Sequence, residues 1–363
     1  MKVLVYGSGP LGSLFAAQLD DGGNEVSIVA RGQRIDDLRQ HGVVLRDVIS
    51  DEETVTRVNV VEGLAPADRY DLVLVVMRKN HALDILPALA ANEGTPNVLF
   101  LMNNAAGPEE LIAALGRERV MIGFPMSAGY RQGHVVHCFI GTEAEPVTIP
   151  FGEVDGRITS RTKEIARVLE SGPGLGAEIR TDMDAWLKYH VALLIPSLVP
   201  ALYMTGADNA RLARTRDAVL LAVRAGREGF QVLRALGLPF SPPRLRFFEW
   251  MPEPILVPML QRLLADEKME VALVKHARAA PDEMKHLADE FLALARGTAV
   301  PTPTIDRLYP HFDPAAPQMP EGSAEIPLDW RPVWRGLGLV AAAVLALVLG
   351  LRGRRRWCGR IRE

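Results

Sequence analysis

Cysteine is almost absent from this 363-residue sequence, which limits the kinds of site that the chain can build. The two cysteines, Cys138 and Cys358, lie far apart and have no metal-ligand spacing. A disulfide framework is therefore excluded, and no metal site is expected. The first residues also lack the long apolar segment of a signal peptide, so we expect a cytoplasmic protein.

An excess of positive charge is also missing from most of the chain. The formal net charge is −3, but the last twelve residues hold six arginines and one acid. The rest carries 35 lysines and arginines against 43 acids. A body this acidic offers no general surface for phosphate groups, so nucleic acid is not expected as a partner. The 48% of hydrophobic residues is ordinary globular usage, and the length predicts two domains.

The first part of the chain alternates short apolar segments with helical patterns. We expect strands at residues 2–6, 25–30, 71–77, 97–102, 120–123, 134–140 and 146–151. A helical pattern follows the first strand, and another covers residues 81–91. This alternation is typical of βαβ units and predicts an α/β domain with one parallel sheet over residues 1–157.

The second half has helical periodicity instead. We expect helices at residues 160–170, 182–204, 207–237, 254–279 and 281–296, divided by glycine and proline. They predict an all-helical domain over residues 158–310. The stretch 298–330 is rich in proline and predicts an extended linker, with 311–333 separating the domain from the tail. The sequence predicts no oligomeric state.

Residues 336–351 form an apolar run without any charge. A helix of this length would be about 24 Å long, shorter than the ~30 Å hydrocarbon core of a bilayer. Trp334 and Trp357 flank the run, as interfacial anchors do. Residues 334–357 therefore predict a transmembrane-like helix with a basic tail, which tethers a cytoplasmic body to the inner face of a membrane. The alternatives are a helix lying in the interface and a buried or dimerising helix.

The turn after the first strand has the pattern G-x-G-x-x-G, formed by Gly7, Ser8, Gly9, Pro10, Leu11 and Gly12. Its place between a strand and a helix makes the pattern informative. Gly7 permits the tight turn, Gly9 lets a pyrophosphate approach the backbone, and Gly12 lets helix and strand pack closely. The phosphates then lie at a helix N-terminus. These features predict a dinucleotide-binding domain of the Rossmann type.

The end of the second strand indicates which dinucleotide is bound. NAD sites usually place an acid there to bind the ribose 2′-hydroxyl. This sequence has Arg31 instead, with Arg34 close behind and the first acid at Asp36. Arg31 can pair with a 2′-phosphate, so the sequence favours NADP(H).

Several blocks of the sequence resemble the ketopantoate reductase (2-dehydropantoate 2-reductase) family. The blocks are GSGPLG at 7–12, VARGQRIDDLRQHGV at 29–43, DLVLVVMRKNHALD at 71–84, MNNAAGPEEL at 102–111, AWLKYHVAL at 185–193, MLQRLLADEKMEV at 259–271 and GTAVPTPTIDRLY at 297–309. The resemblance implies a Rossmann domain with a helical domain, an active site in the cleft between them, and reduction of a 2-oxo acid by NADPH.

The resemblance also implies roles for individual residues. Lys188 matches the family's catalytic lysine, which hydrogen-bonds the substrate carbonyl and supplies a proton. Glu270 matches a substrate-site glutamate, which would orient Lys188 or bind a substrate hydroxyl. Asn103 matches an asparagine near the nicotinamide, and Arg78 replaces a lysine on the cofactor side.

Three hydrogen-bonding positions of the family are lost here, at Ala192, Pro196 and Pro258. We therefore expect a reductase whose small-molecule carbonyl substrate is larger or more apolar than ketopantoate. One alternative is a membrane-tethered NADP(H)-binding sensor or scaffold without turnover. Another is a related enzyme that acts on hydroxy acids or imines in the opposite direction.

Overall fold

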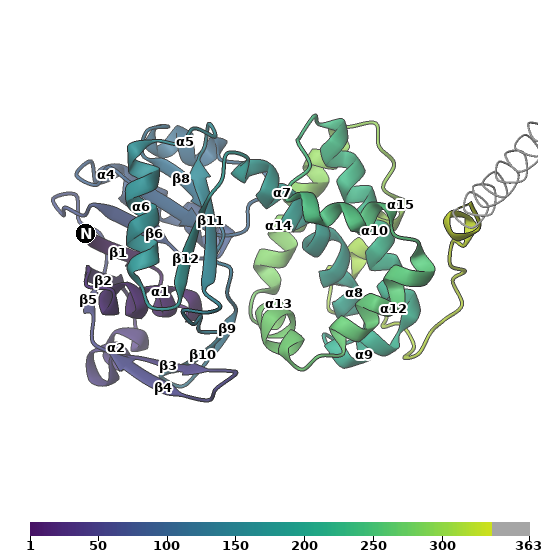
Figure 1. The fold of residues 1–363 in the computed structure, drawn as a ribbon, viewed down its shortest axis with the longest axis horizontal. Helices are drawn as coiled ribbons and strands as arrows, with labels where there is room; N and C mark the ends of the chain where they lie inside the picture. The colour runs from purple at the N-terminus through teal and green to yellow at the C-terminus, as the bar shows by residue number, and fades with distance from the viewer. Residues whose placement is uncertain (336–363) are drawn as a thin grey trace, which may run out of the picture.

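An eight-stranded sheet forms the centre of the first domain in the computed structural model, which describes residues 1–335 (Figure 1). The strands, in spatial order, are β12 (Leu175–Ile179), β11 (Val147–Glu153), β8 (Val120–Gly123), β7 (Val98–Leu101), β6 (Leu72–Val75), β1 (Lys2–Tyr6), β2 (Glu25–Val29) and β5 (Asn59–Val61). All neighbours are parallel except β8 and β11. The predicted α/β class is confirmed.

Helices cover both faces of this sheet, which explains why its strands are apolar on both sides. Val3 and Val5 pack with α1 (Pro10–Asp21) and α6 (Ser160–Ser171) in one core. Leu4 and Tyr6, on the other face, pack with the remaining helices. These are α3 (Lys79–Asp84), α4 (Leu86–Ala91), α5 (Glu109–Leu115) and the start of α7 (Met183–Leu193).

A second, four-stranded sheet was not predicted. Its order is β4 (Glu53–Thr56), β3 (Val43–Asp47), β10 (Val135–Cys138) and β9 (Gly129–Gln132). The prediction that residues 134–140 extend the main sheet is therefore wrong. Their alternating burial identifies a half-buried strand, but alternation does not show which sheet the strand joins. Helix α2 (Gln33–His41) connects the main sheet to β3.

The helical domain is built around α10 (Arg216–Ala235), which is packed by most of the other helices. Those in contact with it are α7, the π-helical turn Leu194–Leu198, α8 (Val199–Met204), α9 (Asn209–Arg214), α11 (Phe247–Trp250), α12 (Glu253–Leu264), α14 (Pro281–Arg296) and α15 (Pro303–Leu308). The π-helical turn Glu270–Val274 and α13 (Lys275–Ala279) connect α12 to α14. Its core includes the buried rings of Tyr189 and Phe230, in contact with Phe240.

Three predicted helices are interrupted. The helix at 81–91 divides into α3 and α4, because Pro87 in the first turn of α4 has no N–H to continue the earlier ladder. The helix at 207–237 divides at Thr215, whose backbone is not helical. The helix at 254–279 is broken between Leu264 and Glu270.

Among the described residues, Met183–Met204 is long and apolar enough to cross a membrane by length and composition. However, 78% of its most apolar window is buried inside the protein. Its hydropathy is therefore that of a core helix. Residues 336–357 of the predicted membrane helix at 334–357 lie outside the described residues.

The proline-rich stretch is more ordered than an extended linker. It contains α15, and beyond it the chain packs along the helical domain. The buried carboxylate of Asp217 accepts hydrogen bonds from the Ser323 hydroxyl at 2.8 Å and from the Glu325 N–H at 2.7 Å. The Asp329 N–H donates to Glu253 at 2.8 Å. The prediction of a linker reaching residue 330 is wrong because these buried acids hold its backbone.

Candidate active site

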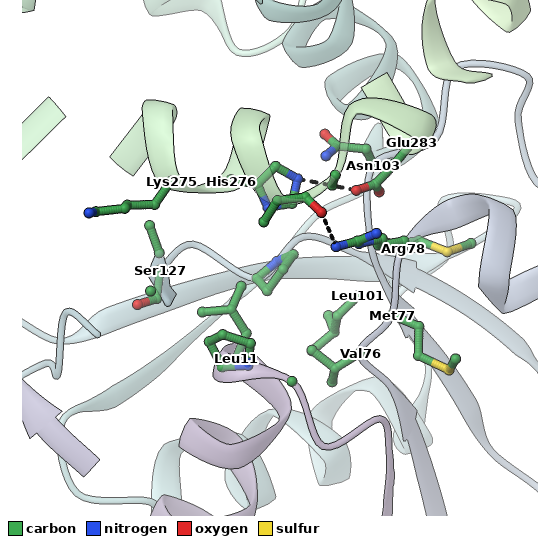
Figure 2. Close-up of a pocket in the computed structure, with 18 of the residues that line it drawn as sticks. Leu11, Val76, Met77, Arg78, Leu101, Asn103, Ser127, Lys275, His276 and Glu283 are labelled. Atoms are coloured by element: carbon green, nitrogen blue, oxygen red, sulfur yellow. Dashed lines mark hydrogen bonds and ion pairs between the residues drawn. The ribbon is translucent and has the colours of Figure 1, made fainter. Parts of the chain in front are cut away.

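The candidate site lies at the carboxyl edge of the parallel sheet. Gly7 follows β1, Arg31 follows β2, and Arg78 and Asn103 follow the ends of β6 and β7. Since β1 pairs with β2 on one side and β6 on the other, the strand order reverses here. Open α/β sheets bind ligands at such a switch point. A cavity of about 580 Å³ opens at this edge, and its wall comes from both domains (Figure 2).

The glycine-rich turn has the geometry of a phosphate loop. Gly7 has a φ of 123°, and a Cβ there would lie 2.4 Å from the Val76 carbonyl oxygen. A Cβ on Gly12 would lie 1.8 Å from the Gly7 carbonyl oxygen, so neither position has room for a side chain. Gly9 has no atom within 4 Å of its Cβ position, which leaves open space over the turn. No side chain caps α1, so its first N–H groups are available to an anion.

Arginines gather in an adjoining cavity, of about 840 Å³, that shares this glycine turn. Arg31 and Arg131 are exposed on its wall, and no ion pair is found for either within residues 1–335. The buried Arg34 donates hydrogen bonds to Ser13 at 3.0 Å and to the His134 carbonyl. Burial and the charge of Arg131 lower the pKa of Arg34 to about 10, so it stays protonated at neutral pH. Such a cluster suits a phosphate.

The helical domain contributes polar groups to the larger cavity. Lys275 and His276 come from α13, and Glu283 comes from the first turn of α14. Figure 2 shows His276 joined to Glu283, with Asn103 beside them. The distance from His276 Nε2 to Glu283 Oε2 is 3.1 Å.

The rest of the wall is mainly apolar, and its helical-domain side chains include Leu194, Ile195, Val199 and Leu273. His190 belongs to this wall too. Its ring stacks on Trp186, 5.2 Å between centroids, and contacts Phe124. Burial lowers the pKa of His190 to about 4, so the ring is neutral at physiological pH.

The lost family positions do not create this apolar wall. None of Ala192, Pro196 and Pro258 is among the residues that line the cavity. Pro258 is exposed, whereas Ala192 is buried against Gly229. The apolar lining of the cavity therefore comes from other residues and not from the three substituted positions that suggested an apolar substrate.

The two residues with implied catalytic roles are not among those that line the cavity either. Lys188 forms an ion pair with Asp184, one turn earlier in α7, and its side chain is 9% exposed. Glu270 forms an ion pair with Lys275, 2.9 Å from its Nζ, so its partner is Lys275 and not Lys188. Their catalytic roles stay predictions. By contrast, the residues predicted to bind the cofactor all line one or both of the adjoining cavities.

Sequence reasoning missed the residues that other elements bring to the site. Arg131 is on β9, a strand that was not predicted, and it lies 100 positions beyond Arg31. His276 and Glu283 are seven positions apart on different helices. No local pattern marks these residues, because only the packing of the two domains places them at the cavity.

Comparison with known proteins agrees with this architecture. Residues 3–153 match the family described as ketopantoate reductase PanE/ApbA. Over 282 residues the chain is 26% identical to the 2-dehydropantoate 2-reductase of Archaeoglobus fulgidus, a match covering 76% of this chain and 89% of that protein.

Solved structures show the same fold over most of the chain. The 2-dehydropantoate 2-reductase of Geobacter metallireducens has a TM-score of 0.70 at 18% identity, covering 87% of this chain and all of the other. A D-mandelate dehydrogenase solved with NADH and anilino(oxo)acetate has a TM-score of 0.69 at 17% identity, covering 86% and 97% of the two chains.

Two alanine substitutions in the glycine turn should separate folding from binding. Gly12→Ala forces a Cβ against backbone, so it should lower the free energy of unfolding by ~2–4 kcal/mol. Gly9→Ala points into open space at an allowed backbone conformation, so stability should change by less than ~1 kcal/mol while dinucleotide affinity falls at least ~10-fold. Urea unfolding and cofactor titration measure the two effects. Unchanged affinity in Gly9→Ala would contradict the assignment of this turn.

Proposed function

Because this chain belongs to the ketopantoate reductase family through its N-terminal domain, we propose that it is an NADPH-dependent reductase of a 2-oxo acid with an apolar side chain. The chain is an oxidoreductase of the class that acts on CH–OH and C=O groups and uses NAD(P)(H). One observation carries the finer proposal: the glycine turn and the arginine cavity open directly into an apolar cavity between the domains.

The residues present fit a dinucleotide. The turn from Gly7 to Gly12 would hold the pyrophosphate at the start of α1, and Arg31 with Arg131 would hold a 2′-phosphate. Asn103 lines the inner cavity, and its Oδ1 is a buried acceptor without a partner in residues 1–335. A bound nicotinamide supplies the two electrons and the hydrogen that reduce a carbonyl carbon.

The cavity also suits an apolar 2-oxo acid. Arg78 and Lys275 place cationic groups on its wall, each paired with one carboxylate of the helical domain, Asp282 or Glu270, and such groups favour a ligand carboxylate. The aliphatic side chains of Leu194, Ile195 and Val199 would cover the other end of the ligand. The D-mandelate dehydrogenase that shares this fold was solved with anilino(oxo)acetate, a ligand of the same general shape.

One observation favours binding without turnover as the second candidate. Lys188, which matches the family's proton source, forms an ion pair with Asp184 and is not among the residues that line the cavity. A sensor or scaffold would bind NADP(H) in the same cavity without transferring hydride to a substrate.

Oxidation of NADPH in the presence of a panel of 2-oxo acids decides between these functions. We expect 4-methyl-2-oxopentanoate or phenylpyruvate to be reduced with a kcat/KM at least ~10-fold above that of ketopantoate, because apolar burial favours them by ~1–3 kcal/mol. The assay follows absorbance at 340 nm. Tight NADPH binding with no oxidation by any member of the panel would reject the reductase and support the sensor.

The arginine cavity predicts a preference for NADPH over NADH. Arg31→Ala should weaken NADPH binding by ~1.5–3 kcal/mol, because it removes a charge-assisted contact to the 2′-phosphate, and should leave NADH nearly unchanged. Fluorescence titration with both cofactors tests this. Arg39→Ala is the control, since Arg39 is exposed on α2 and pairs with Glu62. Equal losses for the two cofactors would reject the assignment of Arg31.

We further propose that the chain beyond residue 335 tethers a cytoplasmic body to the inner face of a membrane. The support is the uncharged run 336–351 and its arginine-rich end. The described residues add that Trp330 and Trp334, 50% and 65% exposed, lie together just before this run. Tryptophan prefers the interfacial region of a bilayer.

Flotation with vesicles that contain anionic lipid tests the tether. The full chain should float with the vesicles, whereas a chain ending at Asp329 should stay in solution and keep its NADPH affinity. The shortened chain retains the Asp329 N–H bond to Glu253, so its helical domain is intact. A full chain that remains in solution without detergent would contradict the proposal.

A further inference from the structure

We propose that the outward face of α12, in the helical domain, docks on the surface of a lipid bilayer that contains anionic headgroups. The inference rests on the membrane tether proposed above and adds the orientation of the protein body on the membrane. It concerns an exposed apolar surface that the reductase site does not use, since none of its residues lines either cavity.

Helix α12 is apolar on two opposite faces, and folding buries only one of them. Leu256 and Leu264 are buried in the helical domain, where α12 packs on α9 and α10. The outward face carries Ile255, Met259 and Leu263, which are four positions apart and are 54%, 40% and 54% exposed. Side chains with this spacing form one stripe along a helix, here about 12 Å long at ~1.5 Å per residue. An exposed second apolar face of this kind is typical of an interaction surface.

Two more residues extend this stripe, because their spacing places them on the same face. Pro258 and Arg262 are both exposed. Pro258 therefore adds apolar surface here and not to the substrate cavity. Arg262 is the only charged residue between positions 254 and 265, and no ion pair is found for it within residues 1–335. A guanidinium beside an apolar surface can reach lipid phosphates while its aliphatic stem lies on that surface.

Exposed tryptophans lie close to α12 in the chain and at its exit. Three of the four tryptophans among the described residues are at least half exposed, namely Trp250, Trp330 and Trp334. Trp250 ends α11, just before α12 begins. The rings of Trp330 and Trp334 are 6.4 Å apart, between centroids. Tryptophan prefers the interfacial region of a bilayer, so these side chains favour a membrane as the partner.

The position of the chain end indicates that a bilayer covers this face. The bond from the Asp329 N–H to Glu253 holds the chain at the start of α12. The uncharged run begins at residue 336, and the seven residues that lead to it span at most about 25 Å. A bilayer that holds the run is therefore within reach of α12. Figure 1 shows α12 and the last described residues on the side of the helical domain away from the sheet domain, so docking there does not cover the cavity between the domains.

The stripe and the tail act together in this arrangement. Interfacial binding scales with the apolar area that is buried, and three aliphatic side chains bury little. A second anchor on the same chain raises their effective concentration at the membrane. The stripe therefore docks only when the tail is in the bilayer, and the chain ending at Asp329 stays in solution. The docked side chains would lie about 5–10 Å deep, at the boundary of headgroups and acyl chains.

Spin-label accessibility in the full chain measures whether the stripe enters the bilayer. Leu263→Cys carries the label in a chain with Cys358→Ser, and Ile158→Cys in the same chain is the matched control, since Leu263 and Ile158 are both 54% exposed. The remaining Cys138 is buried and stays unlabelled. On vesicles with anionic lipid, the ratio of oxygen to nickel-chelate accessibility should be at least ~3-fold higher at position 263 than at position 158, because oxygen concentrates in the apolar region that the label enters.

Flotation of the labelled chains separates failure of the docking from failure of the tether. Chains that float and give equal ratios at the two positions overturn the docking and leave the tether in place. Chains that do not float overturn both. A label at position 263 that is protected from both reagents, with spin–spin broadening, identifies a second copy of the chain as the occupant. The same protection without broadening identifies residues 336–351. Either result overturns the bilayer as the partner.

Polar substitution within the stripe tests whether its apolar character causes the docking. Ile255→Gln combined with Met259→Gln should bring the ratio at position 263 down to that at position 158, while the chain still floats through its tail. Glutamine is a good helix former and both positions are exposed, so α12 should still fold. Unchanged NADPH affinity checks this, because neither residue lines a cavity. A ratio at position 263 that stays high in this variant overturns the role of the stripe.

Discussion

The contact between the start of α14 and the start of α3 determines the shape of the site. Arg78 Nη1 donates to Asp282 at 3.1 Å, and Asn80 donates to the same carboxylate at 2.8 Å. Glu283 accepts the N–H of Lys79. These bonds hold the helical domain against the carboxyl edge of the sheet. The cavity exists because two bodies with separate cores meet at this edge, and the helix that closes it carries Glu283.

A buried charge makes this arrangement hard to change. Lys79 is fully buried, with its Nζ 3.0 Å from Asn104 and 3.7 Å from Glu290 of α14. Glu290 also accepts the N–H groups of Ala105 and Ala106. Separation of the domains would leave an ammonium and a carboxylate without these partners, and removing one partner of a buried pair costs ~3–5 kcal/mol. The domains therefore keep the position in which α14 reaches the cofactor edge.

Local sequence predicted the half of the site that one segment builds. Gly7 and Gly12 are read directly from the pattern after the first strand: a Cβ on Gly12 would meet the Gly7 carbonyl within the same turn, and the turn gives Gly7 a positive φ. Arg31 follows from its place at the end of the second strand. The main sheet was equally predictable, since strands buried on both faces are apolar throughout. By contrast, the sheet that β10 joins and the cavity position of His276 depend on contacts between distant segments, and no local pattern records them.

Two neighbouring asparagines show how satisfied and unsatisfied groups distinguish structure from function at this edge. Asn104 donates to the Gly107 carbonyl at 2.8 Å and accepts from the Gly107 N–H and from Lys79. Its Oδ1 and one of its amide N–H groups have partners inside the protein, so its role is to hold the turn and the buried ammonium. Asn103 lines the cavity, and its Oδ1 has no partner among the described residues. An unpaired buried acceptor costs ~1–3 kcal/mol, and a ligand N–H removes that cost.

The same criterion applies to the charged groups. Lys188 and Asp184 form an ion pair within α7, so neither charge needs a ligand as its partner. Arg31 faces its cavity with no ion pair found in the described chain, and His276 keeps one ring nitrogen without a protein partner. Folding does not require these polar groups to remain without a protein partner. They lie on cavities that share one glycine turn, which is the arrangement that a dinucleotide and a small carbonyl substrate need in order to meet.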